Sequence, residues 1–402
     1  MKQLDEIDNM TDFFEEFFEA KRFDFDLEKK QFIEHMDYLK EMSVQELTLY
    51  KKHEEVQEYL KQINKSQVTK AKIWTPSNLK DKDQTLSELS LIEPEIKFVS
   101  AEDKRAVEDW YMVRIFCHSM SFDQNPGRFL RYTIYDRTTE KILGIASIGS
   151  DVVSIQCRDK WIGWSHKERL ASGRLNNSAI GTCIMATQPF GYNFLGGKLA
   201  ASLLCTKEVS KSWEDTYQNK LVGLTTTSLY GTSSMYNSIP YWKKLGASQG
   251  KIAIKPDDKF YNKWHQFLKG KYPELYLKTI TSSHDGPVTG VKQKIMSMMF
   301  KEMGISSSKY AHGFERGVYY APLYENTREF LRGEIEDKDL IPLVKLSSDR
   351  NGIVDWWRSK AIRRYEKLLS EDRLNPQVLY YNRGIGMEWD KFKKLYLGDL
   401  GR

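Results

Sequence analysis

The chain has 402 residues, of which 40% are hydrophobic and 29% are charged, a balance typical of a globular protein with two or three packed units. Its formal net charge of +6 permits contact with nucleic acid or a phosphorylated cofactor without requiring either. No stretch approaches 18 uncharged apolar residues, the start is acidic, and the four cysteines form no CxxC pair, so we expect a cytoplasmic protein without a membrane anchor, a secretory signal or disulfides.

The sequence pattern of residues 8–66 predicts helices. Apolar residues recur at three- and four-residue steps from Phe13 to Leu60, and Ser43 with Glu46 forms a capping box that restarts the helix. We therefore predict that residues 1–66 form a helical arm, which is either a helical hairpin or an arm that binds a protein partner. Residues 67–95 are polar and lack a period, which favours a linker.

Strands and helices alternate in the next segment, residues 96–260. A helix is expected near residues 107–120, and two β-rich runs with a short polar connection predict a hairpin over 129–136 and 142–150. A buried strand within 177–190, a helix after it, a strand within 220–231 and a short helix closed by Gly246 complete the pattern. This order predicts a mixed α/β sheet.

The C-terminal part continues with an extension and a helical region. Residues 261–345 combine aromatic helices with a strand at 316–324, and residues 346–402 are helical. The segment 356–367 carries five basic residues against one acidic residue, so it is either a partner surface or a solvated helix face.

A glycine-containing turn lies between the third strand and its helix. The residues expected to bind a phosphate there are Gly191, Asn193, Gly196, Gly197 and Lys198. Glycines let backbone N–H groups approach a phosphate, and a helix N-terminus adds positive charge. The spacing resembles a Walker A loop, but Leu199 stands where that loop has a hydroxyl, which excludes a nucleotide triphosphatase. The alternative is a turn whose glycines serve only close packing.

The turn and a later segment resemble the GNAT acyltransferases. Asn193 to Gly196 is similar to the pyrophosphate loop of that family, and residues 241–246 resemble the helix that carries its catalytic tyrosine. In this alignment Trp242 takes the tyrosine's place, so Tyr236 or Tyr241 is the candidate acid. The resemblance implies a GNAT-like core that uses acetyl-CoA or a related acyl-CoA.

A polar and aromatic insertion follows the second strand. It contains Arg158, Asp159, Trp161, Trp164, Arg174, Asn176 and Asn177. Indoles beside arginine and asparagine suit stacking on a base and reading its edge. We expect these residues to bind the acceptor, with Asp159 as the general base. The alternative is a structural ion pair between Arg158 and Asp159, with the tryptophans in the core.

Four segments resemble the Druantia A-like domain family: residues 158–165, 175–181, 236–251 and 314–333. The resemblance covers about 115–335 and implies a context of anti-phage defence, mobile elements or phage genomes, and hence the host cytoplasm if the protein is phage-encoded. Scattered histidines and the absence of a GxSxG motif argue against a metal site and a serine hydrolase.

Two functions follow from these patterns. The first is a GNAT-like transferase that moves an acyl group from acyl-CoA to a DNA base or another amine. The alternative is a catalytically inactive GNAT-like module that binds DNA or a protein.

Overall fold

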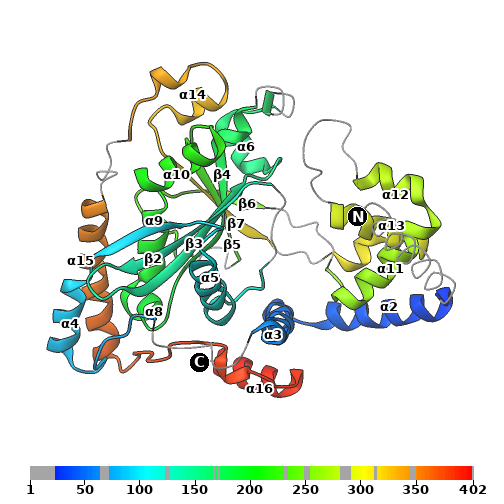
Figure 1. Cartoon of the computed structure of the whole chain (residues 1–402), viewed down its shortest axis with the longest axis horizontal. Coiled ribbons are helices and arrows are strands. Elements are labelled where there is room, and N and C mark those ends of the chain that lie inside the picture. The colour runs from blue at the N-terminus through cyan, green and yellow to red at the C-terminus, as the bar shows by residue number, and fades with distance from the viewer. Residues whose placement is uncertain are drawn as a thin grey trace, which may run out of the picture. The chain divides into compact units, whose positions relative to one another are not determined.

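The chain divides into two compact units, and the computed structural model describes most of both (Figure 1). The described residues are 23–63, 72–122, 127–165, 168–169, 173–229, 234–248, 254–280, 291–311, 315–343 and 350–400. One unit comprises Met1–Leu47 with Gln249–Phe314, and the other Thr48–Ser248 with Glu315–Arg402. The boundaries expected near residues 66 and 260 differ from these, because two segments far apart in sequence form the smaller unit.

The larger unit is built on a seven-stranded mixed sheet with the strand order β1-β2-β3-β4-β5-β7-β6. The strands are β1 (Pro94–Val99), β2 (Phe129–Asp136), β3 (Lys141–Ser150), β4 (Ser178–Ala186), β5 (Gly223–Ser228), β6 (Lys243–Ser248) and β7 (Arg316–Pro322). The prediction of a mixed α/β fold with a hairpin over 129–136 and 142–150 is therefore confirmed.

The strand sequences explain their places in the sheet. In β2 buried and partly buried side chains alternate, with Leu130, Tyr132 and Ile134 in the core, as the period of a strand requires. Strand β3 is buried along almost its whole length, because helices cover both of its faces. Hydrophobic runs of this kind are typical of central strands.

One strand pair differs from the rest. Neighbouring strands run antiparallel except β4 and β5, which pair in parallel through three residues, Ser178–Ile180 with Gly223–Thr225. After these pairs β4 continues to Ala186 along β3, with a register shift between Ser147 and Ile148, whereas β5 stays with β7. The two strands therefore part, and the glycine turn follows the end of β4.

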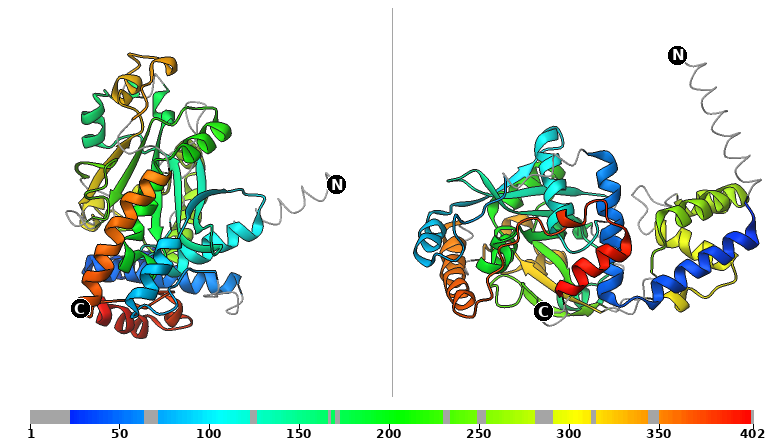
Figure 2. Two further views of the ribbon diagram at one scale, coloured as in Figure 1. Left: turned by 90° about the vertical axis from the view of Figure 1, so that its left-hand side faces the viewer. Right: turned by 90° about the horizontal axis from the view of Figure 1, so that it is seen from below.

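Helices cover one face of the sheet with an apolar core. These are α4 (Lys82–Leu91), α8 (Phe190–Phe194), α9 (Gly196–Leu203), α10 (Lys207–Tyr217) and α15 (Arg350–Ser370). Trp213 of α10 and Trp357 of α15 are fully buried in this core. Helix α15 packs against α4, α8 and α9, and Figures 1 and 2 show α15 (orange) running beside α4.

A second core lies on the opposite face. It is formed by α3 (Val44–Gln62), α5 (Lys104–Cys117) and α16 (Trp389–Leu400). Val56, Trp110, Phe116 and Phe392 are fully buried there, and Trp110 Nε1 donates to the carbonyl of Ala146 in β3 at 3.2 Å. The short helix α6 (Gln156–Ile162) lies against β6 and β7 at the other end of the sheet.

The smaller unit is helical. It joins α2 (Phe25–Glu41) to α11 (Asp258–Lys271), α12 (Pro273–Ile280) and α13 (Val291–Glu302), which follow β6 in the chain. Its core holds Phe32, Trp264, Leu268 and Phe300, and the rings of Phe32 and Trp264 meet edge to face with centroids 6.0 Å apart. The phenylalanines expected at the start of the arm, before residue 23, lie outside the described residues.

Two local predictions are wrong. Residues 243–248 form β6 and not a helix, because they pair with β7 along an irregular register in which Gly246 has φ 151°. The segment expected as a linker contains α4 and the first residues of β1, where Asp81 caps α4 by accepting from the N–H of Gln84 at 3.0 Å. The helical character of the C-terminal region is confirmed by α15 and α16.

Candidate functional site

The glycine turn after β4 is where the sequence predicts a cofactor. It runs from α8 through Leu195, which has φ 54°, into α9. A Cβ at Gly196 would lie 2.4 Å from the ring of Phe190, and one at Gly197 would lie 2.8 Å from the sulfur of Met235. Gly196 is therefore needed for close packing against a rigid ring, which agrees with the alternative that the sequence left open, whereas at Gly197 the flexible Met235 side chain is able to move aside.

Asn193 fastens this turn to the C-terminal segment. Its side chain is buried, and its Nδ2 donates to the carbonyls of Pro189 at 2.8 Å and Asn375 at 2.7 Å. Its Oδ1 accepts from the N–H of Asn375 at 3.0 Å. The N–H of Gly191 donates to the carbonyl of Thr187 at 2.7 Å. The groups of Gly191 and Asn193 that were expected to meet a pyrophosphate thus already bind the chain itself.

Three basic side chains gather beside the turn, and we call Lys198, Lys360 and Arg364 the cationic rim. Lys198 belongs to α9 and the other two to α15, which is held against the turn by the indole N–H of Trp357 donating to the carbonyl of Phe194 at 2.8 Å. All three rim side chains are partly exposed.

The rim cations are held by neutral groups. Lys198 Nζ donates to the carbonyls of Met235, at 3.1 Å, and Asn237. The guanidinium of Arg364 lies 5.0 Å from the ring centroid of Tyr192. Burial, and next the charge of Lys360, lower the pKa of Lys198. Among the described residues no carboxylate pairs with a rim cation, so the rim offers uncompensated positive charge.

The two candidate acids are both buried in the core, and Tyr236 lies beside β5, with its hydroxyl 3.5 Å from that of Thr226. Tyr236 is 6% exposed, and its ring lies 5.2 Å from those of Trp242 and Tyr319. Burial raises the pKa of Tyr236 above its ordinary value and raises that of Tyr241 to about 12. Neither phenol faces solvent, so proton donation from either one requires the substrate to enter the core.

Asp159 belongs to a buried charge network, which we define as Asp151, Arg158, Asp159 and Arg169. Arg158 Nη1 lies 2.7 Å from Asp151 Oδ1, Arg158 Nη2 lies 2.7 Å from Asp159 Oδ1, and Arg169 pairs with the other Asp159 oxygen. Burial alone would lower the pKa of Arg158, but the two carboxylates outweigh it and the pKa is raised.

The charge network is also tied to the sheet. Asp151 Oδ2 accepts from the hydroxyls of Ser178 at 2.6 Å and Thr225 at 2.7 Å, at the parallel pair of β4 and β5. Asp159 Oδ2 accepts from the N–H of Ile155 at 3.1 Å, at the start of α6. With these bonds Asp159 has the surroundings of a structural ion pair, the alternative to a general base.

The other predicted acceptor residues occupy separate places. Trp164 is buried and its Nε1 donates to the carbonyl of Leu331 at 2.6 Å, Asn177 Nδ2 donates to the carbonyl of Lys220 at 2.7 Å, and Arg174 pairs with Glu336. The carbonyl of Asn176 accepts from Arg128 at 3.1 Å. These contacts join loops to the sheet and do not converge on one cavity.

Trp161 is a partly exposed residue of the predicted acceptor set, as is Arg174, and Asn176 is exposed. Lys243 Nζ lies 5.6 Å and the Arg328 guanidinium 5.4 Å from its ring centroid, and Tyr320 packs against it with centroids 5.2 Å apart. An aromatic ring held between two exposed cations suits contact with an anionic or aromatic ligand.

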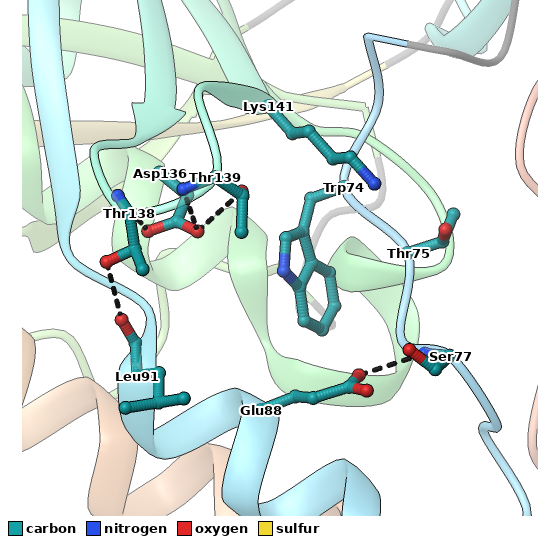
Figure 3. A pocket seen from close by; sticks show the side chains of 9 residues that line it. All are labelled: Trp74, Thr75, Ser77, Glu88, Leu91, Asp136, Thr138, Thr139 and Lys141. Atoms are coloured by element: carbon teal, nitrogen blue, oxygen red, sulfur yellow. Dashed lines mark hydrogen bonds between the residues drawn. The ribbon is translucent and has the colours of Figure 1, made fainter.

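A small pocket of about 220 Å³ lies away from all of these residues, and Figure 3 shows its lining. Trp74 forms one wall, and Asp136, Thr138 and Thr139 come from the turn between β2 and β3. Its carboxylates are occupied: Glu88 accepts from the N–H of Ser77, and Asp136 accepts from three backbone N–H groups and the Thr139 hydroxyl. We assign these groups to turn formation.

Within the described ranges no group of three or more His, Cys, Asp or Glu side chains could hold a metal ion. Nor does any helix there have the length and apolar character needed to cross a membrane.

Sequence reasoning did not find the partners that the chain brings from a distance. Lys360 and Arg364 were visible only as part of the basic segment 356–367, and the approach of Lys360 to Lys198 and of Arg364 to Tyr192 depends on the docking of α15. Asp151 follows β3 in the sequence without any motif, and only the folded sheet places it beside Arg158.

Comparison with known proteins gives one consistent result. Residues 44–333 match the family model described as Druantia protein DruA. A curated relative, the Druantia protein DruA of Escherichia coli (strain UMEA 4076-1), is 27% identical over 286 residues, which are 66% of this chain and 68% of the relative. No solved structure matches.

Proposed function

The chain belongs to the Druantia DruA family, which is associated with anti-phage defence, and from this premise we propose that it binds an acyl-CoA or related phosphorylated donor and transfers the acyl group to an amine. The acceptor we propose is a DNA base or another amine on a phage or host molecule. Residues 44–333, which match the family model, contain the complete sheet and the glycine turn.

The observation that carries this proposal is the cationic rim beside the glycine turn. Coenzyme A bears a pyrophosphate and a ribose phosphate, and its anionic groups require cations that no carboxylate neutralises. The rim supplies Lys198 from α9 and Lys360 and Arg364 from α15. The N-terminus of α9 adds partial positive charge at the same place.

The sheet supports the same proposal. The glycine turn, which resembles the pyrophosphate loop of the GNAT acyltransferases, follows β4, and β4 parts from its parallel neighbour β5 after three residue pairs. In the reaction the amine nitrogen attacks the thioester carbonyl, a C–N bond forms, the C–S bond breaks, the thiolate takes up a proton, and the amine gives one to water. The chain contributes mainly by positioning the two reactants.

A second candidate is a binding protein without catalytic activity. It is favoured by the burial of Tyr236 and Tyr241 and by the ion pairs of Asp159, because none of these groups has a free path to a substrate. In this case the rim and Trp161 would hold a phosphate-bearing partner without changing it.

Thermal unfolding of the full chain with acetyl-CoA tests donor binding. Ligand at about 100 times its Kd adds about 2.7 kcal/mol to the free energy of unfolding, so we expect a clear rise in Tm. The double variant Lys360→Glu/Arg364→Glu should lose this rise. The matched control is Arg363→Glu, on the exposed side of the same helix, which should keep it. No rise for the unmodified chain would reject donor binding.

Mass spectrometry then separates the two candidates. Nucleosides and proteins from cells that express the chain should carry an acyl adduct that is absent from cells expressing Lys360→Glu/Arg364→Glu. A donor-dependent rise in Tm without any adduct would favour the binding protein over the transferase.

A further inference from the structure

Strand β1 forms one edge of the seven-stranded sheet, and we call its unpaired side the open edge. It stands first in the strand order and pairs with β2 over residues 94–99. Within the described part of the chain no further strand or isolated bridge pairs with β1. An edge strand presents backbone N–H and C=O groups that a strand of another chain can bind.

The pairing of β1 with β2 determines which backbone groups face the open edge. Just before the strand, the N–H of Arg137 donates to the carbonyl of Glu93 at 2.9 Å. Successive residues of an antiparallel strand direct their backbone groups to alternate sides, so the odd-numbered residues of β1 bond to β2. The groups of Pro94, Ile96 and Phe98 therefore face the open edge, and no described residue bonds to the N–H of Ile96 or Phe98.

The side chains of β1 add an exposed ring and two charges that lack ionic partners. Phe98 is 45% exposed. Glu95 accepts from the phenol of Tyr135 at 3.0 Å, and Lys97 Nζ lies 4.2 Å from the centroid of the same ring. Neither Glu95 nor Lys97 forms an ion pair with a described residue. Because they are two residues apart, these opposite charges lie on the same face of the strand.

We propose that β1 pairs with β1 of a second copy of this chain, antiparallel and about a twofold axis at Ile96. In this register the N–H of Ile96 donates to the carbonyl of Ile96 of the partner subunit. The N–H of Phe98 donates to the carbonyl of Pro94 of the partner subunit, and the symmetry repeats both bonds. Glu95 then lies opposite Lys97 of the partner subunit in a pair without backbone hydrogen bonds, where cross-strand side chains come closest.

The sequence of β1 favours a second copy as the occupant and selects this register. Glu95 and Lys97 stand one residue on either side of Ile96, so twofold pairing matches each charge with its opposite. An axis at Glu95 or at Lys97 would instead place like charges opposite each other, which is unfavourable. Proline and lysine on an edge strand ordinarily discourage pairing. Here Pro94 costs one N–H at each end of the ladder, and Lys97 meets a carboxylate.

Sedimentation velocity of the full chain over a range of protein concentrations tests the proposal, and it should show a reversible monomer–dimer equilibrium. Lys97→Glu and Glu95→Lys each place like charges opposite each other at two symmetric positions. Each should raise the dissociation constant of the dimer about 10-fold or more. The double variant Glu95→Lys/Lys97→Glu restores opposite charges and should return the constant to that of the unmodified chain.

The matched control is Lys391→Glu, which makes the same change of charge at an exposed position of α16 and should leave the dissociation constant unchanged. An unmodified chain that stays monomeric throughout the micromolar range would overturn the proposal. So would a double variant as weak as the single ones, or an equal loss in Lys391→Glu, which would indicate an effect of net charge. The inference does not rest on the transferase proposal, because its readout is the association of two copies without donor or acceptor.

Discussion

Two charged regions of the larger unit differ in how their charges are satisfied. The charge network places two arginines and two aspartates in the interior, where each pairs within the set. The cationic rim places three basic side chains at the surface, where their contacts within the described residues are with carbonyl groups and aromatic rings. Removal of one member of a buried charge pair leaves the other uncompensated and destabilises the fold, whereas an exposed cation contributes little to stability and is free to bind an anionic ligand.

The largest effect should come from breaking the charge network. Asp151→Ala leaves Arg158 buried beside a single remaining carboxylate and frees the hydroxyls of Ser178 and Thr225. We expect the free energy of unfolding to fall by about 3–5 kcal/mol, measured by urea denaturation. Asp355→Ala removes an exposed ion pair and should cost less than about 1 kcal/mol. Equal losses would remove the distinction between the two kinds of charge.

Lys52, a buried lysine on the opposite face of the sheet, allows the effect of a buried charge on the free energy of unfolding to be measured through its pH dependence. Lys52 is fully buried and pairs with Glu55 at 2.6 Å, and burial lowers its pKa to about 8 from 10.5. Below pH 8 this lysine is protonated in both states, and between about 8 and 10.5 only the unfolded chain holds the proton. Its contribution to the free energy of unfolding should therefore rise with pH across this window, by up to about 3 kcal/mol.

The measurement is the pH dependence of urea unfolding for the unmodified chain minus that for Lys52→Met. This difference cancels the other groups that titrate in the window. A difference that stays flat or falls with pH would mean that Lys52 is not held as a buried, weakly basic amine.

The glycine turn should respond less strongly. Gly196→Ala places a methyl group against Phe190 and Ala186, and overpacking of this kind costs about 1–3 kcal/mol. The matched control is Gly398→Ala in α16, where a Cβ meets nothing within 4 Å and alanine should stabilise the helix by about 0.5–1 kcal/mol. Opposite signs in the two variants, read from Tm, would confirm that Gly196 serves packing.

The smallest effect on stability should come from the rim. Lys360→Gln/Arg364→Gln removes two cations and the contact with Tyr192, and should change the free energy of unfolding by no more than about 1 kcal/mol. The affinity for acetyl-CoA, measured by calorimetry, should fall about 10-fold. A large loss of stability with unchanged affinity would place the rim with the charge network as a structural feature.

Much of the sheet follows from the sequence because its strands carry their own pattern. The alternation of 129–136 and the apolar runs within 177–190 and 316–324 each contain an observed strand. Strand β1 was missed because its six residues include Pro94, Glu95 and Lys97 and follow a polar stretch. Strand β6 was read as a helix because its position is fixed by pairing with β7, about 70 residues later.

The candidate site was less predictable for the same reason. The turn itself was located, but the role of Asn193 depends on Asn375, and the setting of Lys198 depends on α15. The sequence left open whether Arg158 and Asp159 form a structural ion pair, because two adjacent opposite charges do not reveal which other charged side chains lie beside them. In the structure Asp151 pairs with Arg158, and Arg169 pairs with Asp159.

The smaller unit joins two segments that lie far apart in the sequence, and this separation sets the order in which its parts are made and can fold. Phe32, Met36 and Leu39 of α2 are fully buried against helices that begin about 200 residues later in the chain. At about 5–20 residues per second, a ribosome needs on the order of 10–40 s to make that stretch. During this delay an acidic helix with an uncovered apolar stripe is present on the nascent chain, which makes it a natural site for chaperone capture.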